Sequence, residues 1–530
     1  MPPFQSRSTG AVSIARIRSL GASASPRTSS AMRTCGESGI DFAVRVNAAE
    51  LRCRVVAEGG NLGLTQRARI EYARADGRVN TDAIDNSGGV DCSDREVNIK
   101  ILLDQAVAAG DLTPKQRNEL LVEMTASVAE LVLRDDYEQT ATLSLSEAQS
   151  ADMIDVHTRF LEFLDGARKL DRELEALPGP EEMAERTRES RGLTRPELAV
   201  LLAYSKIELY AQLLDSDVPE DAHLSAELDH YFPAPLPERF ADEMRGHRLR
   251  REVIATQVIN NMLHGGGTTF VFRLHEESGA PPSDIARAYA AARDIFSMRP
   301  QWAEIEALDG QIDSDVQTQL FLAGRRLVER GSRWLLAHRS RPLDIGATVN
   351  FFSPGANAVA DALPRLLGAS DVEPLMVQAE ELEQAGVPPA LAQRVAGLGT
   401  MFATFDIVEV ADETGLEIEE VARVHFRLAD RLDLHWLRDR IVELPRDDRW
   451  RALARAALRD DLYSLHRSLT AEVLRQPGRD PDAWVEHNPA AERCMQTLAE
   501  IRVGHVFDTT TLPVAVREVR NLLRAGAASR

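Results

Sequence analysis

The sequence predicts a mainly α-helical protein, in which a short α/β unit is followed by a large all-α region of many helices. Two observations support this fold class. Between residues 50 and 85, two runs of β-forming residues flank one amphipathic segment, which is the order of a strand, a helix and a second strand in a parallel sheet. After Ser93, apolar residues recur at helical spacing, as at Leu198, Leu201, Leu202 and Leu209.

The first segment, residues 1–40, differs in composition from the rest of the chain. It is irregular, rich in Arg and Ser, and without acidic residues before Glu37. One interpretation is a transit peptide, which typically has this composition. The other is a wrongly chosen start codon or a frame disruption in an Arg-biased gene. Prolines and glycines interrupt any amphipathic targeting helix, which favours the second interpretation; they are Pro2, Pro3, Gly10 and Gly21.

The α/β unit is expected within residues 41–110. A run of strand-forming residues at Cys53–Val56 predicts a buried strand. After a glycine-rich turn, Thr65 is placed to cap a helix over Gln66–Ala75, which Gly77 would end. Arg78–Ile84 is rich in β-formers and predicts the second strand. Because ligands bind at the carboxyl ends of parallel strands, the segments after both strands are candidate binding loops.

Residues 111–530 are expected to form a helical domain, subdivided near residues 290–300. A second apolar stripe supports this expectation, made by Leu249, Val253, Ile254 and Met262. Pro- and Gly-rich breaks predict many helices instead of one long coil; they fall at residues 178–180, 233–237, 265–267, 298–300 and 476–478. The break at residues 265–267 is interpreted as a helix C-cap.

Two features of the helical domain invite a functional interpretation that their surroundings disfavour. Residues 407–424 resemble a DNA-reading helix-turn-helix, but their many acidic residues would face phosphates, so a plain helical hairpin is favoured. Lys206 follows a helix start at Thr194–Glu197 and is interpreted as a solvated helix lysine without a catalytic role.

Charge and cysteine content exclude several classes of protein. The net charge of −21 disfavours binding to nucleic acid or to anionic membranes. No uninterrupted apolar run approaches the roughly 20 residues that a membrane helix needs. The four cysteines form no C-x-x-C pair, which argues against a metal site and against a secreted disulfide framework. We therefore expect a cytoplasmic protein without a metal.

Two segments contain the candidate ligand-binding residues. The first is Ala-Glu-Gly-Gly-Asn-Leu-Gly-Leu-Thr at residues 57–65, and the second is Asn-Ser-Gly-Gly-Val-Asp-Cys-Ser-Asp-Arg-Glu at residues 86–96. Both are expected to follow strands. Glycines allow close approach of a ligand to the backbone, and Asn side chains both donate and accept hydrogen bonds, as a carboxamide such as nicotinamide requires.

Together these segments resemble the glutamate dehydrogenase family, whose catalytic domain ends with an E-G-A-N segment and then an N-A-G-G-V-x-x-S segment. The distance from Glu58 to Asn86, 29 residues inclusive, is also that of the family pattern. Gly60 replaces the alanine of the commoner pattern. The residues around these segments, 80–87 and 96–100, are similar to the large bacterial NAD-specific branch of that family. This resemblance implies a Rossmann-like catalytic domain, NAD as cofactor, L-glutamate and 2-oxoglutarate as substrates, and a homo-oligomer.

The resemblance also implies roles for individual residues. Asn61 and Asn86 would lie beside the nicotinamide and its ribose, with Gly59 and Gly60 in the same cofactor-binding loop. Val90 would line the substrate pocket, and Ser93 would bind the side-chain carboxylate of the substrate. The alternative is that Asn61 and Asn86 only satisfy the backbone of their turns, as Asn beside Gly commonly does.

The family's catalytic lysines and its dinucleotide fingerprint have no counterpart in the sequence. Lysine occurs only at positions 100, 115, 169 and 206, and no G-x-G-x-x-G follows a predicted strand. We therefore expect a C-terminal portion of such a dehydrogenase, catalytically incomplete by itself, with its catalytic residues unknown. The alternative is a noncatalytic helical scaffold, or a subunit that docks onto a separate dehydrogenase chain.

Overall fold

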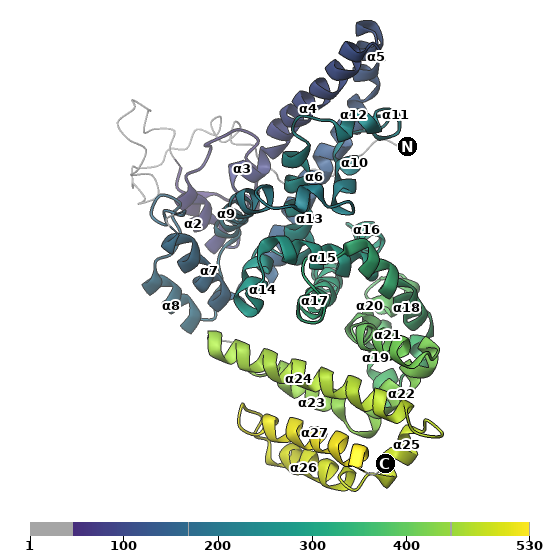
Figure 1. Ribbon diagram of the computed structural model, residues 1–530. Coiled ribbons are helices and arrows are strands. Elements are labelled where there is room, and N and C mark those ends of the chain that lie inside the picture. The colour runs from purple at the N-terminus through teal and green to yellow at the C-terminus, as the bar shows by residue number, and fades with distance from the viewer. Residues whose placement is uncertain (1–45, 168, 446–447, 529–530) are drawn as a thin grey trace. The chain divides into compact units, whose positions relative to one another are not determined.

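The computed structural model describes residues 46–167, 169–445 and 448–528. The expected irregular segment, residues 1–40, lies outside them. The described chain is mainly helical (Figure 1), as predicted, and its single sheet has two strands. It divides into two compact units, the first ending at Ala286 and the second beginning at Arg287. Among the described residues, no helix is both long enough and apolar enough to cross a membrane.

The first unit opens with the predicted strand, helix and strand. After a short 3-10 helix, η3 (Ala48–Glu50), the chain forms β1 (Val55–Val56), α2 (Gln66–Arg74) and β2 (Arg78–Val79). The two strands are parallel, with Val56 beside Val79. Thr65 caps α2, because its Oγ accepts a hydrogen bond from the N–H of Ala68 at 3.2 Å. A small apolar core holds the unit together, made by Ala48, Val56, Ala68, Tyr72 and Val79.

Two local predictions about the α/β unit were wrong. β1 has only two residues, and Val55 is 45% exposed, so the first strand is not fully buried. The second strand stops at Val79, and Asp82–Asp85 forms the short helix α3. Its carboxylates accept hydrogen bonds from the loop after β1, and these tertiary contacts outweigh the β propensity of the segment.

The turn after α2 uses two residues in different ways. Asp76 adopts the left-handed conformation, with φ of 61°, the role that was expected of Gly77. At Gly77 a Cβ atom would lie 2.3 Å from the ring of Tyr72. Glycine is therefore required at this position by the close approach of Tyr72, and not by its backbone conformation.

The rest of the first unit is a bundle in which α4, α6, α9 and α13 pack on one another. Leu198, Leu201, Leu202 and Leu209 are buried in it, as predicted, but Leu249 is 37% exposed. The helices and short 3-10 turns are α4 (Ser87–Ala109), α5 (Pro114–Glu123), α6 (Thr125–Ala148), α7 (Ile154–Gly166), α8 (Pro180–Arg188), α9 (Arg195–Leu214), η4 (Val218–Glu220), η5 (Leu224–Ala226), α10 (Glu227–Tyr231), α11 (Leu236–Arg239), α12 (Ala241–Arg245), α13 (Arg250–Gly266) and α14 (Phe270–Ser278). The boundary between the two units falls within the next helix, α15 (Pro282–Ile295).

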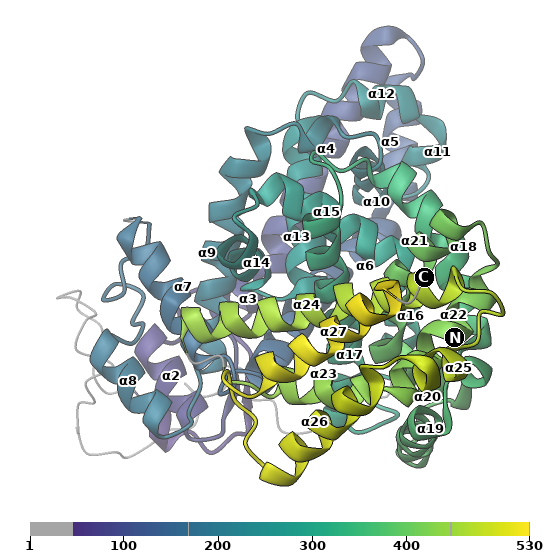
Figure 2. The same ribbon diagram turned by 60° about the horizontal axis from the view of Figure 1, so that its bottom comes forward.

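The second unit is entirely helical over its described residues. Figure 2 shows α24, α26 and α27 side by side, as in Figure 1. Phe405 is fully buried and contacts Trp334 and Phe352, with ring centroids 4.6 and 5.1 Å away. The helices are α16 (Met298–Glu306), α17 (Ser314–His338), α18 (Ile345–Leu366), α19 (Ala369–Gln384), α20 (Pro389–Met401), α21 (Thr404–Thr414), α22 (Ile418–Arg431), α23 (Leu434–Val442), α24 (Arg449–Leu474), α25 (Pro481–His487), α26 (Ala491–Gly504) and α27 (Leu512–Ala528).

The predicted helix breaks differ in outcome. α13 ends at Gly266, and Gly267 with φ of 99° caps it, so the expected C-cap at residues 265–267 is confirmed. The segment 407–424 is a helical hairpin, α21 and α22, turned at Gly415. The break expected at residues 298–300 was placed too late. Ser297 takes the left-handed conformation, and α16 already begins at Met298.

The buried Asp406 makes the stability of the second unit depend on pH. Asp406 is 3% exposed, and its Oδ1 accepts a hydrogen bond from Trp334 Nε1 at 3.4 Å. Burial raises the pKa of Asp406 to about 7, although Arg467 acts in the opposite direction. Because the folded-state pKa exceeds that of the unfolded chain, the folded state loses stability as pH rises from about 4 to about 7. Asp406→Asn removes the charge and is expected to raise the unfolding temperature at about pH 8.

The measurement is tryptophan fluorescence during thermal unfolding, since all five Trp residues lie in the second unit. The advantage of Asp406→Asn over the natural chain should shrink between about pH 8 and about pH 5. Asp412→Asn, at an exposed position of the same helix, is the control and should show no such dependence. An advantage of Asp406→Asn that is equal at both pH values contradicts the prediction.

Candidate functional site

The two glycine-rich segments lie against each other in the first unit. β1 and β2 run parallel, so their carboxyl ends lie at one edge and the segments after them emerge together. The backbone N–H of Glu58 donates to Asp85 Oδ2 at 2.8 Å, and that of Leu62 donates to Asp82 Oδ2 at 2.9 Å. The loop at residues 57–65 is thus bound to the segment at residues 80–86 by backbone donors and carboxylate acceptors.

A buried arginine on α2 connects the two segments. Arg69 of α2 and Glu58 are 5% and 1% exposed. Arg69 Nε lies 2.5 Å from Glu58 Oε2, and its Nη2 lies 3.0 Å from Asp82 Oδ1. Glu58 Oε1 also accepts a hydrogen bond from the N–H of Leu64 at 2.8 Å. One guanidinium therefore neutralises a carboxylate of each segment, which compensates for the cost of burying these charges.

The predicted cofactor-binding residues lie on the exposed side of this loop. Gly59, Gly60 and Asn61 are exposed. A Cβ atom at Gly59 or Gly60 would meet no atom within 4 Å, and neither glycine has a left-handed φ. Packing and backbone conformation therefore do not require glycine at these two positions. What glycine leaves there is open space above the backbone, which a ligand can approach closely.

The predicted cofactor-binding Asn86 and the predicted substrate-binding Val90 and Ser93 share this exposed side. Asn86, Val90 and Ser93 occupy positions i, i+4 and i+7 at the start of α4, so they lie on one face of the helix. Val90 is 71% exposed, and Ser93 is exposed with its Oγ donating to the carbonyl of Gly89 at 3.1 Å. Asn86 Nδ2 donates to Asn61 Oδ1 at 2.7 Å. We call the surface formed by Gly59, Gly60, Asn61, Asn86, Val90 and Ser93 the loop face.

The opposite side of α4 is packed against the bundle. Arg95 is 2% exposed, and it pairs with Asp91 at 3.2 Å and with Asp135 of α6. Its Nη1 donates to the carbonyl of Tyr231 at 2.6 Å. Burial raises the pKa of Asp91 to about 6, and Asp135 adds to this effect while Arg95 opposes it. These contacts orient α4 so that Val90 and Ser93 remain on the exposed side.

Lys206 is not the solvated lysine that the sequence suggested. It is half-buried, and its Nζ donates to Gln139 Oε1 at 3.2 Å. Gln139 in turn donates to Ser87 Oγ at 3.5 Å, at the first turn of α4. Burial lowers the pKa of Lys206 to about 8, although Asp135, Glu138 and Asp91 favour its charged form. The prediction was wrong because α6 packs on the side of α9 that carries Lys206. The spacing of the apolar residues in α9 did not indicate a neighbour on that side.

Sequence reasoning missed Arg69 and Asp85, which connect the two segments. Arg69 lies four residues after the N-cap Thr65, and an arginine in a first helical turn carries no distinctive signal. Asp85 accepts from Glu58 and also from Asn80 Nδ2, at 2.7 Å. Its only signal in the sequence was its place directly before Asn86. Both roles depend on a contact between segments more than ten residues apart.

These features define a mainly helical protein with paired glycine-rich loops at the carboxyl edge of a small parallel sheet. Two known families match the chain. The family described as "Glutamate dehydrogenase, C-terminal" matches residues 190–521, and the chain belongs to this family. The family described as "Bacterial NAD-glutamate dehydrogenase, catalytic domain" matches residues 27–146, which include the loop face.

Three similar proteins each carry the name "NAD-specific glutamate dehydrogenase". The protein of Halomonas elongata is 43% identical over 492 residues, that of Pseudomonas aeruginosa 44% over 489, and that of Mycobacterium tuberculosis 41% over 488. The matched region covers 91 to 92% of this chain and 30% of each relative. The chain therefore spans about 30% of the length of these relatives.

Removing the buried guanidinium tests whether Arg69 holds the two segments together. Arg69→Met leaves Glu58 buried without its partner, so the free energy of unfolding of the first unit should fall by about 3–5 kcal/mol. The backbone N–H groups of Leu62 and Leu64 should also exchange faster with deuterium, since their acceptors Asp82 and Glu58 lose their anchor. Denaturant unfolding followed by circular dichroism and hydrogen exchange by mass spectrometry measure the two effects.

Arg74→Met is the matched control on the same helix. Arg74 is 45% exposed and pairs with the equally exposed Glu182, so its loss should change stability by less than about 0.5 kcal/mol. If Arg69→Met were as mild as this control, the buried pair would not hold the loops.

Proposed function

We propose that this chain is part of an NAD-dependent glutamate dehydrogenase, which converts L-glutamate to 2-oxoglutarate and ammonia. The names of its relatives and the match of residues 27–146 to a bacterial NAD-glutamate dehydrogenase catalytic domain support this. In this proposal β1, α2 and β2 belong to a Rossmann-like catalytic domain and the loop face is one wall of its active site. The whole enzyme is proposed to be a homo-oligomer.

The observation that carries the proposal is the hydrogen bond between Asn61 and Asn86. Asn86 Nδ2 donates to Asn61 Oδ1 at 2.7 Å. Asn61 therefore retains its amide donors and Asn86 retains its carbonyl acceptor, side by side on an exposed surface. A nicotinamide carboxamide needs one acceptor for its amide and one donor for its carbonyl, and this pair offers both. Such an arrangement fits a carboxamide better than two separate turn caps.

The remainder of the loop face suits the substrate. Ser93 can donate its hydroxyl to a carboxylate once it releases the carbonyl of Gly89. Val90 presents an apolar surface for the methylene groups of glutamate. The cofactor supplies the chemistry of hydride acceptance from the α-carbon of glutamate. The residues of the chain orient the two reactants, and correct orientation alone lowers such barriers substantially. Neither segment contains a lysine, so no acid–base role is assigned to the loop face.

The alternative is a noncatalytic helical scaffold or a subunit that docks onto a separate dehydrogenase chain. The two proposals differ in what the loop face binds. A dehydrogenase portion binds the nicotinamide end of the cofactor there, whereas a scaffold has no use for a carboxamide-binding pair. A ligand limited to the nicotinamide end separates them, because it does not require a pyrophosphate-binding loop.

Reduced nicotinamide mononucleotide is the probe, and its fluorescence on titration into the 530-residue chain is the measurement. We expect saturable binding with a dissociation constant on the order of 1 mM, since few contacts are available. Asn86→Ala removes an acceptor for the carboxamide and should weaken binding about tenfold. Because Asn86 bonds at the exposed surface, thermal stability should change little.

Asn118→Ala, at an exposed position of α5, is the matched control and should bind as the natural chain does. Unchanged affinity in Asn86→Ala would remove the cofactor role of the Asn pair. If the natural chain shows no saturable binding, the result favours the noncatalytic scaffold.

Gly60→Ala is expected to weaken ligand binding without affecting folding. A Cβ atom at Gly60 meets no protein atom within 4 Å, so the unfolding temperature should stay unchanged while the affinity for reduced nicotinamide mononucleotide falls several-fold. Gly88→Ala provides the contrast, because its Cβ would lie 3.0 Å from Asp136 Oδ2 and 3.4 Å from Val132. That variant should lower stability. Calorimetry and the same titration measure both effects, and equal affinity in Gly60→Ala would contradict a ligand close to this loop.

A further inference from the structure

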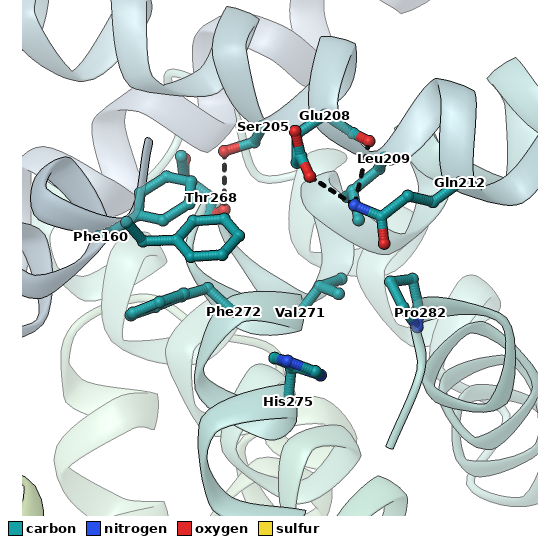
Figure 3. A pocket seen from close by; sticks show the side chains of 11 residues that line it. Phe160, Ser205, Glu208, Leu209, Gln212, Thr268, Val271, Phe272, His275 and Pro282 are labelled. Atoms are coloured by element: carbon teal, nitrogen blue, oxygen red, sulfur yellow. Dashed lines mark hydrogen bonds between the residues drawn. The ribbon is translucent and has the colours of Figure 1, made fainter. Parts of the chain in front are cut away.

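The first unit contains a pocket that the proposed function does not use. It lies between α7, α9 and α14 and extends to Pro282 at the start of α15, with a volume of about 70 Å³. Figure 3 shows Ser205, Glu208, Leu209 and Gln212 of α9 along one side of it and Val271, Phe272 and Pro282 opposite them. The volume is several times what one water molecule requires.

Three phenylalanines form one wall of the pocket. The rings of Phe160 and Phe272 lie 5.1 Å apart, those of Phe163 and Phe272 lie 5.5 Å apart, and Phe160 stacks on Phe163 at 6.4 Å. Phe160 is 3% exposed, but Phe163 is 40% exposed. The pocket therefore has a buried apolar interior and opens toward solvent at Phe163. Rings in this arrangement offer both faces and edges to another aromatic ring.

A buried hydroxyl without a partner lies in this apolar surrounding. Thr268 is 5% exposed and lines the pocket, beside Ser205 and the phenylalanine side chains in Figure 3. Within the described chain, Thr268 Oγ1 has no hydrogen-bond partner. Ser205 does not supply one, since its Oγ bonds to the carbonyls of Leu201 at 2.8 Å and Thr268 at 3.1 Å. An unsatisfied buried hydroxyl costs about 1–3 kcal/mol.

The other polar groups of the pocket already have hydrogen-bond partners in the protein. Glu208 accepts hydrogen bonds from Lys169 and from Gln212. His275 donates from Nδ1 to the carbonyl of Ala280 at 2.9 Å. Thr268 is therefore the one lining side chain, among those described, that needs a bond from inside the pocket. No charged group there awaits a counter-ion, which argues against an ionic ligand.

We propose that this pocket binds a small uncharged aromatic molecule with one hydroxyl or N–H group. The ring would pack against Phe160, Phe163 and Phe272, and its polar group would bond to Thr268 Oγ1. A single ordered water fits less well, because the apolar lining offers it fewer than the two to four partners that buried waters have. The pocket contains no residue of the loop face. α9 lines the pocket and also carries Arg195, whose side chain donates to Asn80 of the α/β unit.

Phenol and toluene are the probes, because they have the same size and differ in one hydroxyl. Each is titrated into the 530-residue chain, and methyl resonances of Val271 and Leu209 report binding by NMR. The natural chain should bind phenol about five- to tenfold more tightly than toluene, which corresponds to one hydrogen bond. Thr268→Val removes the hydroxyl while keeping the shape, so it should abolish this preference and leave toluene binding intact.

Two further variants distinguish a local site from a general effect. Thr256→Val replaces an exposed helical threonine and should keep the preference for phenol. Phe272→Ala removes part of the aromatic wall and should weaken both probes. The proposal is overturned if neither probe causes saturable shifts at Val271 and Leu209, or if Thr268→Val retains the preference for phenol. Neither result depends on binding of nicotinamide at the loop face.

Discussion

The buried guanidinium of Arg69 is the constraint on which the loop face depends. It pairs with Glu58 in the loop after β1 and with Asp82 in the segment after β2. Two carboxylates placed so close without a cation would repel each other and be costly to bury. With Glu58 and Asp82 neutralised by Arg69, the two segments can approach each other. The N–H of Glu58 then donates to Asp85, and the N–H of Leu62 donates to Asp82. This arrangement brings Asn61 within hydrogen-bonding distance of Asn86.

The helical part of the first unit holds this small α/β unit through α9. Arg195 at the start of α9 donates to Asn80, and Gln66 of α2 donates to the carbonyl of Pro196 at 3.0 Å. Glu197 keeps this helix start in place, since it completes the capping box with Thr194 and pairs with the buried Arg186 at 2.7 Å. The match to the C-terminal glutamate dehydrogenase family begins at residue 190, so this family region itself contacts the segment of the catalytic-domain match. That contact gives the helical region a definite structural task.

Predictions from the sequence succeeded where the signal was local. The N-cap at Thr65, the C-cap at Gly267 and the hairpin turned at Gly415 each follow from residues within one or two turns of helix. Predictions failed where a distant segment decided the outcome. Asp82–Asp85 is helical instead of extended because its carboxylates bond to the first loop, and Lys206 is half-buried because α6 packs beside it.

The sequence by itself determined the helical class and the parallel order of strand, helix and strand, because periodicity and capping are encoded locally. It also contains the two motifs that hold the six residues of the loop face, whose proposed roles come from the resemblance to a family. Only the tertiary structure decided that Asn61 and Asn86 bond to each other, that Arg69 lies between the two segments, and that Thr268 is buried without a partner. The physical reason is that hydrogen bonds, ion pairs and desolvation depend on which groups meet in space, and residues far apart in the chain meet only after the helices have packed.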